Sequence, residues 1–377
     1  MAVVSVVLFL AGMAMVALTA GSTLRTIVVP RGIPALLPRM VFIGVRVVIS
    51  ALSGRSADYE RRDRIMAFYA PVALLTMPIA WLTVVAAGYT CMYWSLGVHP
   101  LRQAFELSGS SLFTLGFISA PDVPTHVLAF TEAGAGIGLL ALLITYLPSL
   151  YSTFSRREAM VALLESRAGG AKSSFGHGPS GAEMLWRFHR IGWRGGLEAV
   201  WPQWEMWFVE VEETHTSVPA LAFFRSPQPD RSWVTAAGAV LDGAALRVSV
   251  VDEPPDPEAQ LCIRAGYVAL RRIADYFDIP YNPDPQRGDP IGVSREEWDR
   301  ACAFLADGGV PLRSDRDEAW LDFAGWRVNY EEVLLALAGL TMAPPAVWSG
   351  DRAAAFRLAR LPKPRGLRRS SRSRGRE

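Results

Sequence analysis

The sequence is poor in cysteine and in the motifs that mark enzymes. Its 377 residues include three cysteines, Cys91, Cys262 and Cys302, whose wide spacing provides neither a disulfide framework nor a CxxC metal pattern. The five histidines form no HxxH or HExxH pattern, and no G-x-S-x-G motif or P-loop occurs. We therefore predict that the protein is not an enzyme and has no catalytic residues, metal or cofactor.

Charge is also scarce, and it is unevenly distributed. Charged residues make up 20% of the chain and hydrophobic residues 51%, an apolar content that excludes disorder for most of the chain. Residues 1–175 hold 13 basic and 8 acidic residues, residues 176–350 hold 15 and 26, and residues 351–377 hold 10 and 2. The overall net charge of +2 therefore hides three different parts: a membrane-like part, an acidic globular part and a basic tail.

Three long stretches carry no charge at all, and they lie at residues 1–24, 65–101 and 133–155. A membrane-spanning helix needs ~20 mostly apolar residues, so each stretch is long enough. We predict spans near 2–21, 67–92 and 127–152. One alternative is a set of buried helices in a large soluble protein. Another, for residues 1–20, is a cleaved signal peptide, because 17–20 (ALTA) resembles a cleavage site although no basic segment precedes it.

The arginines predict the orientation. Eight lie in residues 22–66, four basic residues follow the third span within 156–172, and the intervening loop has only Arg102. The positive-inside rule then places 22–66 and everything after 153 in the cytoplasm, and the N-terminus and the 93–126 loop outside, in a plasma (inner) membrane. Residues 33–52 are apolar but contain Arg39 and Arg46. We expect an amphipathic helix lying along anionic lipid rather than a fourth span.

The loop between the second and third spans contains a recognisable layout. A short amphipathic segment, 101–113, carries Ser110 and Ser111 near its C-terminal end. It is followed by Thr114, Leu115, Gly116 and Phe117. This layout of helix, half-helix, TLGF and helix resembles the pore module of the potassium-channel superfamily, whose filter reads TVGYG or a close variant. The resemblance covers residues 67–155, with the pore loop at 101–118.

The resemblance implies a function and an assembly. Residues 101–113 would be the pore helix, with its negative C-terminal end facing a cation, and backbone carbonyls around 114–117 would replace the hydration shell of potassium or another monovalent cation. One loop supplies a quarter of a filter, so a homotetramer is implied. The sequence departs from the pattern at Ile118, where the second filter glycine belongs. A β-branched residue resists positive φ, which puts potassium selectivity and conduction in doubt.

The third span contains further candidate residues. Gly134, Gly136 and Gly138 permit bending and close packing, and Gly134 with Gly138 forms a small-xxx-small pattern. Pro148 could kink the inner end of the helix. Glu132 is an acid near the outer end, where we expect a cation attractor, a partner for the pore helix, or a side chain that reaches the interface.

The rest of the chain reads as a cytoplasmic region. Residues 156–181 continue the helix into a Gly/Ser linker, and residues 182–350 form an acidic, Trp-rich, mostly helical domain. We expect helices near 183–213, 231–250, 257–278, 294–308 and 315–341, a capping box at Ser294 and Glu297, and tryptophans that pack in the core rather than forming a ligand cage. Residues 351–377 are Arg-rich and are expected to be disordered and to bind anionic lipid; nucleic acid is not an expected partner.

Together these features predict an all-α membrane protein with three transmembrane helices, a re-entrant pore-like half-helix and a helical cytoplasmic domain. The predicted function is potassium-channel-like passive transport of monovalent cations, regulated by the cytosolic domain. The alternative is a non-conducting membrane scaffold or sensor with a degenerate pore loop, whose cytosolic domain binds a partner.

Overall fold

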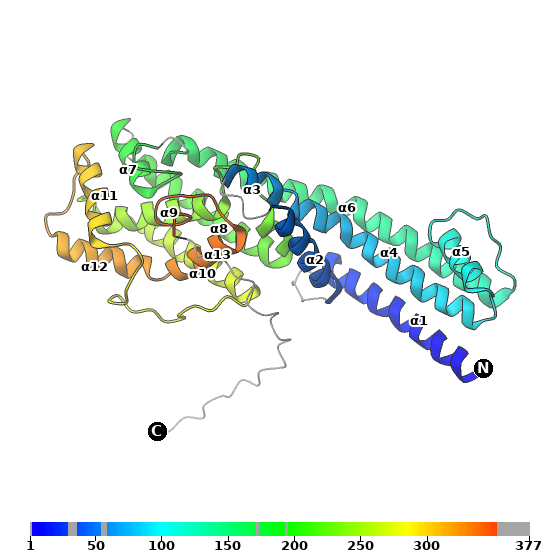
Figure 1. The fold of residues 1–377 in the computed structure, drawn as a ribbon. Coiled ribbons are helices and arrows are strands. Elements are labelled where there is room, and N and C mark those ends of the chain that lie inside the picture. Colours follow the sequence, from blue (N-terminus) through cyan, green and yellow to red (C-terminus); the bar gives the residue numbers. More distant parts are fainter. Residues whose placement is uncertain (1, 29–35, 54–58, 171–172, 193–194, 353–377) are drawn as a thin grey trace, which may run out of the picture.

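The computed structural model describes residues 2–28, 36–53, 59–170, 173–192 and 195–352. Within these ranges the chain is all-helical and has no β-strand, as predicted. Figure 1 shows two parts: a bundle of long helices that carries the N-terminus at its far end, and a compact group of shorter helices at the other end. The predicted tail at 351–377 lies outside the described residues beyond Arg352, as does part of the predicted Gly/Ser linker.

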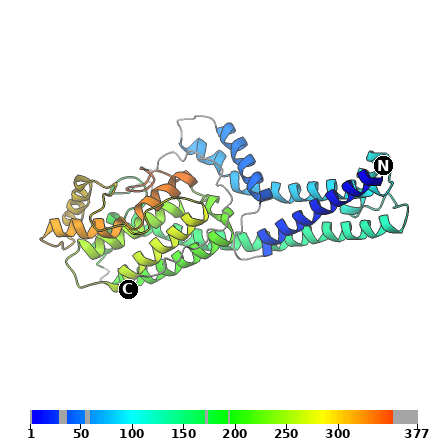
Figure 2. The same ribbon diagram turned by 90° about the horizontal axis from the view of Figure 1, so that it is seen from below.

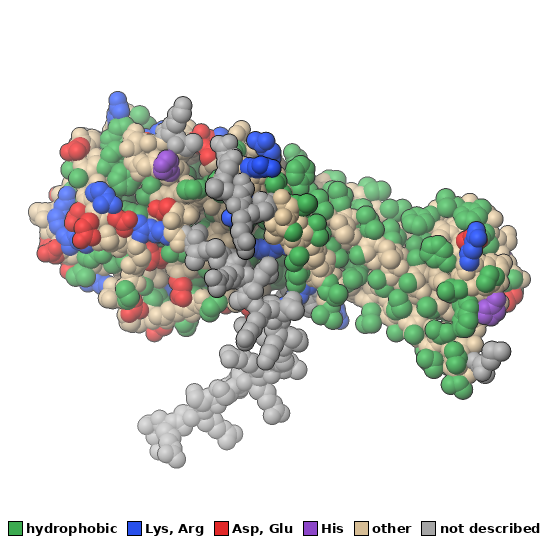
Figure 3. Space-filling model, in the orientation of Figure 1, with side chains coloured by type: hydrophobic (Ala, Val, Ile, Leu, Met, Phe, Trp, Pro, Cys, Tyr) green, Lys and Arg blue, Asp and Glu red, His purple; other side chains and the backbone are tan. Residues whose placement is uncertain are grey.

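The long bundle consists of α1 (Ala2–Thr23), α4 (Tyr69–Ser95) and α6 (Val123–Ala168). α1 continues into a π-helical turn, Leu24–Val28. Over the described chain, three helical segments are long and apolar enough to cross a membrane, Val3–Ile27, Arg61–Ser95 and Val123–Ala168, which confirms the predicted number. Charged side chains gather on the compact part, whereas the visible face of the bundle is mostly hydrophobic (Figure 3).

α1 and α4 pack through a pair of glycines. A Cβ atom built on Gly88 would lie 2.9 Å from the carbonyl oxygen of Gly12, and one built on Gly12 would collide with the carbonyl oxygen of Gly88. The two backbones therefore approach each other as closely as in other small-residue helix crossings. The sequence did not predict this contact, because the two glycines lie in different uncharged stretches and no local pattern pairs them.

α2 (Leu36–Ser53) and α3 (Tyr59–Met66) lie where the bundle meets the compact part (Figures 1 and 2). α2 packs on α4, with the rings of Phe42 and Tyr69 edge to face at 6.1 Å. The guanidinium of Arg46 is buried and donates to the carbonyl oxygen of Leu340, 3.2 Å away. A helix is thus present at the position expected for 33–52, but its Arg46 contacts the compact part of the same chain.

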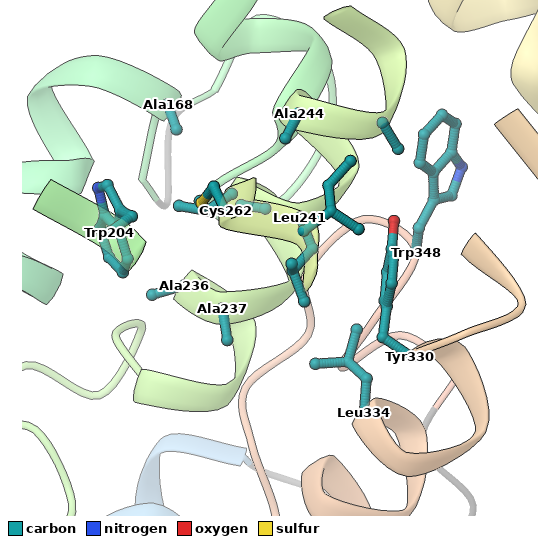
Figure 4. Close-up of a cluster of buried hydrophobic side chains, with 14 of the residues drawn as sticks. Ala168, Trp204, Ala236, Ala237, Leu241, Ala244, Cys262, Tyr330, Leu334 and Trp348 are labelled. Atoms are coloured by element: carbon teal, nitrogen blue, oxygen red, sulfur yellow. The ribbon is translucent and has the colours of Figure 1, made fainter. Parts of the chain in front are cut away.

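The compact part is built around α9 (Trp233–Ser249), in which nearly every residue is buried. It is covered by α7 (Gly181–Arg190), α8 (Gly196–Ser217), the 3-10 helix η2 (Pro219–Phe223), α10 (Pro257–Tyr276), α11 (Arg295–Asp307), α12 (Arg316–Arg327) and α13 (Glu331–Thr341). Figure 4 shows part of this core, in which Leu241 of α9 lies between Cys262 and Tyr330. Trp201, Trp204 and Trp207 are buried in it, as expected for core packing.

Two of the expected helices are interrupted. The expected helix 183–213 breaks after Arg190 and restarts at Gly196, next to Gly195 with φ of 80°. The expected helix 315–341 is divided between α12 and α13. The helices expected at 231–250, 257–278 and 294–308 are present to within two residues at each end, and the Ser294–Glu297 capping box is formed. The apolar periodicity continues across both breaks. The sequence pattern therefore predicted one helix in each place where the structure has two.

A buried ion cluster links α9, α12 and α13. The guanidinium of Arg327 is fully buried and pairs with Asp242 and, at 2.8 Å, with Glu331. It also donates to the carbonyl oxygen of Trp348 at 2.6 Å, and the Tyr330 hydroxyl donates to Asp242 at 2.8 Å. Burial raises the pKa of Asp242, and Arg327 opposes that shift.

Candidate functional site at the end of the bundle far from the compact part

α5 (Leu101–Leu112) lies against both α4 and α6 at the end of the bundle opposite the compact part (Figure 1). It ends one residue before the predicted half-helix. One face is buried, with Ala104, Leu107, Ser108 and Leu112 turned into the bundle, while Leu101 and Phe105 are exposed. The amphipathic pattern of the sequence thus corresponds to a half-helix supported on one side by the two neighbouring helices.

Ser110 holds the loop that follows α5. Its carbonyl oxygen accepts from the backbone N–H of Leu115 at 2.8 Å, and its hydroxyl oxygen accepts from the N–H of Phe117 at 3.1 Å and of Ile118 at 3.4 Å. The carbonyl oxygen of Ser111 accepts from the N–H of Thr114 at 3.0 Å. The two serines at the end of the predicted pore helix therefore bind the backbone of the TLGF segment.

The backbone of this loop is left-handed at two positions. Thr114 has φ of 53° and Gly116 has φ of 70°, whereas Leu115, Phe117 and Ile118 do not have positive φ. Threonine adopts this region rarely, so Thr114 is strained. The side chains of Phe113, Leu115 and Phe117 are 53%, 63% and 64% exposed. The apolar side chains of the loop are thus exposed, while Ser110 hydrogen-bonds its backbone on the side that faces α5.

Glu132 is fully buried where α4, α5 and α6 meet. Its Oε2 accepts from the hydroxyl of Tyr93 on α4 at 2.9 Å. Its Oε1 lies 2.5 Å from the hydroxyl oxygen of Ser108 on α5. Of the three roles considered from sequence, the contacts are those of a partner for α5; the side chain does not reach the surface.

The three glycines of α6 lie in two different environments. A Cβ on Gly136 would collide with the carbonyl oxygen of Leu112, at the C-terminal end of α5, so only glycine fits there. Gly134 and Gly138 have nothing within 4 Å of a built Cβ. Among the described residues the packing face expected from Gly134 and Gly138 is therefore not used, and Gly136 makes the close contact instead. Pro148 lies inside α6 with an exposed side chain.

The start of α6 has a capping box that the sequence reading missed. Asp122 accepts from the Thr125 N–H at 3.0 Å, and the Asp122 N–H donates to the Thr125 hydroxyl oxygen at 3.2 Å. The Thr125 hydrogen bonds lower the pKa of Asp122. The available signal was the Asp-x-x-Thr spacing just before an apolar run, with Pro124 in the first turn.

Arg157 forms a second unpredicted site at the other end of the bundle. Its guanidinium is buried and donates to the carbonyl oxygens of Leu221 at 2.7 Å and Phe224 at 2.8 Å. It also contacts Nε2 of His215 at 3.0 Å and pairs with Glu158. From sequence Arg157 served only as an orientation signal. In the structure it joins α6 to α8 and η2.

α6 therefore connects the site at α5 directly to the compact part. Its first half carries Glu132 and Gly136, and its last residues, Val161, Leu164 and Ala168, belong to the core built around α9.

Comparisons of the chain with protein families, curated proteins and solved structures find no match. Any function must therefore be argued from the geometry itself.

Proposed function

We propose that the protein is an integral membrane protein whose chains assemble, as a homotetramer, into a pore for potassium or another monovalent cation. The observation that most supports this proposal is the arrangement of α5 and the loop that follows it. α5 is supported by α4 and α6, and it is followed by a loop that the Ser110 hydroxyl holds from behind. Polar backbone at membrane depth requires burial in protein or contact with water, and a loop shared by four chains around an aqueous axis meets that requirement.

The exposed face of α6 supports the assembly. Glu132 and Gly136 face α5, and roughly the opposite side of the helix is lined by exposed, mostly small residues at spacings of three and four. We call these residues the α6 stripe: Gly134, Gly138, Ala141, Thr145, Pro148 and Ser152. Small residues let helices approach closely in lipid, so the α6 stripe suits contact with a second copy of the chain.

The orientation follows from the charges. The N-terminus and α5 lie at one end of the bundle, and the compact acidic part lies at the other (Figure 1). By the positive-inside rule the end with the compact part is cytoplasmic and the α5 end is outside, in a plasma membrane. The Arg-rich segments would lie near anionic headgroups.

Potassium flux from liposomes that contain the purified full-length protein tests the proposal. The informative variant is Gly116→Asp, which places a charge in the loop, and the matched control is Gly97→Asp. Gly97 also has positive φ and open space around it, but it lies before α5. We expect flux in the wild type and in the control, and its loss in Gly116→Asp. Absence of flux from folded wild-type protein would contradict the proposal.

One observation favours the non-conducting alternative. Ile118 does not have positive φ, so the left-handed conformation that a second filter glycine would supply is absent at position 118. If flux is absent, the scaffold or sensor function is favoured, with the compact part as the site of partner binding.

A further inference from the structure

If the carboxyl group of Glu132 is ionised, the Ser108 hydroxyl faces two acceptor oxygens with a single hydrogen. One of these oxygens, the carbonyl oxygen of Ala86, also accepts from the Thr90 hydroxyl at 2.7 Å. The Ser108 hydroxyl oxygen lies 2.5 Å from Glu132 Oε1 and 3.1 Å from the carbonyl oxygen of Ala86 on α4. A serine hydroxyl has one hydrogen, so it can donate to only one of these oxygens. With an ionised Glu132, the other contact would be between two acceptors.

A proton on Oε1 of Glu132 removes this conflict. The protonated carboxyl group then donates to the Ser108 oxygen, and Ser108 donates its own hydrogen to Ala86. On the other side the Tyr93 hydroxyl donates to Oε2 at 2.9 Å, and Ser111 in turn hydrogen-bonds Tyr93. Both contacts of the Ser108 oxygen then contain a hydrogen, and no two acceptor oxygens of this network face each other without one.

In the part of the chain that the structure describes, no positive charge lies near enough to hold an ionised carboxylate at Glu132. The polar groups facing Glu132 are Ser108 from α5 and the two tyrosines Tyr89 and Tyr93 from α4. The charged pair of α5, Arg102 and Glu106, is on the solvent side of that helix. Within the described residues Glu132 forms no ion pair, and an unpaired charge buried at this depth is costly.

We propose that Glu132 is a proton-binding site that fastens α5 to α4 and α6 when it is occupied. Release of the proton leaves a buried carboxylate that takes the Ser108 hydrogen away from Ala86, and the contact between α5 and α4 weakens. Because Ser110 lies two residues further along α5 and holds the loop at 114–118, the proton would control the order of that loop. The inference rests on contacts within one chain and does not depend on conduction.

Infrared spectroscopy of the full-length protein in a detergent that has no ester or carboxyl group tests this site, because a protonated carboxyl group absorbs apart from a carboxylate. At neutral pH we expect a protonated-carboxyl band that is lost in Glu132→Gln and retained in the matched control Glu106→Gln. In Ser108→Ala, which removes the acceptor of the acid proton, we expect the band to shift. This second variant keeps the test decisive if Glu132→Gln does not fold. Absence of the band from the wild type, or its persistence unchanged in Glu132→Gln, would overturn the proposal.

Hydrogen exchange across α5 provides the functional readout. Glutamine can accept from Tyr93 and donate to Ser108, so Glu132→Gln should keep the α5 amides as protected as in the neutral wild type, even in alkaline buffer. The wild type should lose protection in alkaline buffer, when Glu132 releases its proton. Equal loss in both proteins would show that α5 does not depend on this proton, and would overturn the proposed control of the loop.

Discussion

Gly136 on α6 lies against the carbonyl oxygen of Leu112, so closely that a Cβ at this position has no room. One helical turn earlier, Glu132 contacts α5 at Ser108. These two contacts fix the middle and the C-terminal end of the half-helix on α6. They determine where the loop at 113–118 begins.

Gly136→Ala should therefore destabilise the bundle. The added methyl group meets backbone rather than a flexible side chain, so α5 must move, at a cost of about 1–3 kcal/mol. Gly134→Ala is the matched control, since its Cβ would occupy open space. Thermal unfolding of both variants in detergent compares them. Equal midpoints would show that α5 does not pack against Gly136 as described.

The three glycines show what the sequence could and could not predict. Uncharged stretches of more than ~20 residues are a property of composition, so the three long helices followed directly. The half-helix also followed, because its apolar face repeats at helical spacing. The rotation of α6 relative to α5 decides which glycine meets α5: Gly134, Gly136 or Gly138. Local sequence patterns do not specify this rotation.

The same limit applies to Arg157. Its position after an apolar stretch identified an end of the third span, but its burial against Leu221 and Phe224 depends on residues more than sixty positions away. Likewise, the pairing of Gly12 with Gly88 joins two helices whose register the sequence does not specify.

Gly88→Leu should separate α1 from α4. The side chain would collide with Gly12 and Val16, and overpacking of this kind costs about 1–3 kcal/mol. Gly21→Leu, on α1, provides the control, because a Cβ built at Gly21 has no atom within 4 Å. Cross-linking between cysteines introduced in α1 and α4 should fall in the first variant only. Unchanged cross-linking in Gly88→Leu would contradict the close crossing.

His215 should make stability depend on pH. Burial, and then the adjacent Arg157, lower the pKa of His215 well below its usual value of ~6.5. The folded protein keeps this histidine neutral, whereas the unfolded chain takes up a proton as the pH falls through ~6.5. The unfolded state then binds more protons, so stability is full above that pH and is lost below it, by up to ~1.4 kcal/mol per pH unit.

His215→Gln should flatten this dependence, and His189→Gln, at an exposed position, should not. The measurement is the thermal midpoint in detergent at about pH 7.5 and about pH 5.5. A wild-type midpoint that is equal at both values would contradict the buried, neutral histidine.

Asp242→Asn should strongly destabilise the compact part. Asp242 is buried, pairs with Arg327 and accepts from Tyr330, so Asp242→Asn weakens charge-assisted hydrogen bonds worth about 1.5–3 kcal/mol each, although Glu331 still pairs with Arg327. Glu318→Gln in the exposed pair with Arg287 is the comparison, for which about 0–1 kcal/mol is expected. Denaturant midpoints from tryptophan fluorescence measure both. Similar losses in the two variants would contradict the difference in burial.

The most direct test of the central claim is whether the loop after α5 lines an ion pathway. Leu115, 63% exposed in the chain, is replaced by cysteine in a background in which the three native cysteines are serine. Leu101→Cys, 59% exposed at the start of α5, is the control. In planar bilayers, a charged thiol reagent should block the potassium current of Leu115→Cys and spare that of Leu101→Cys. No current from the folded parent protein, or equal block of both variants, would contradict a pore formed by this loop.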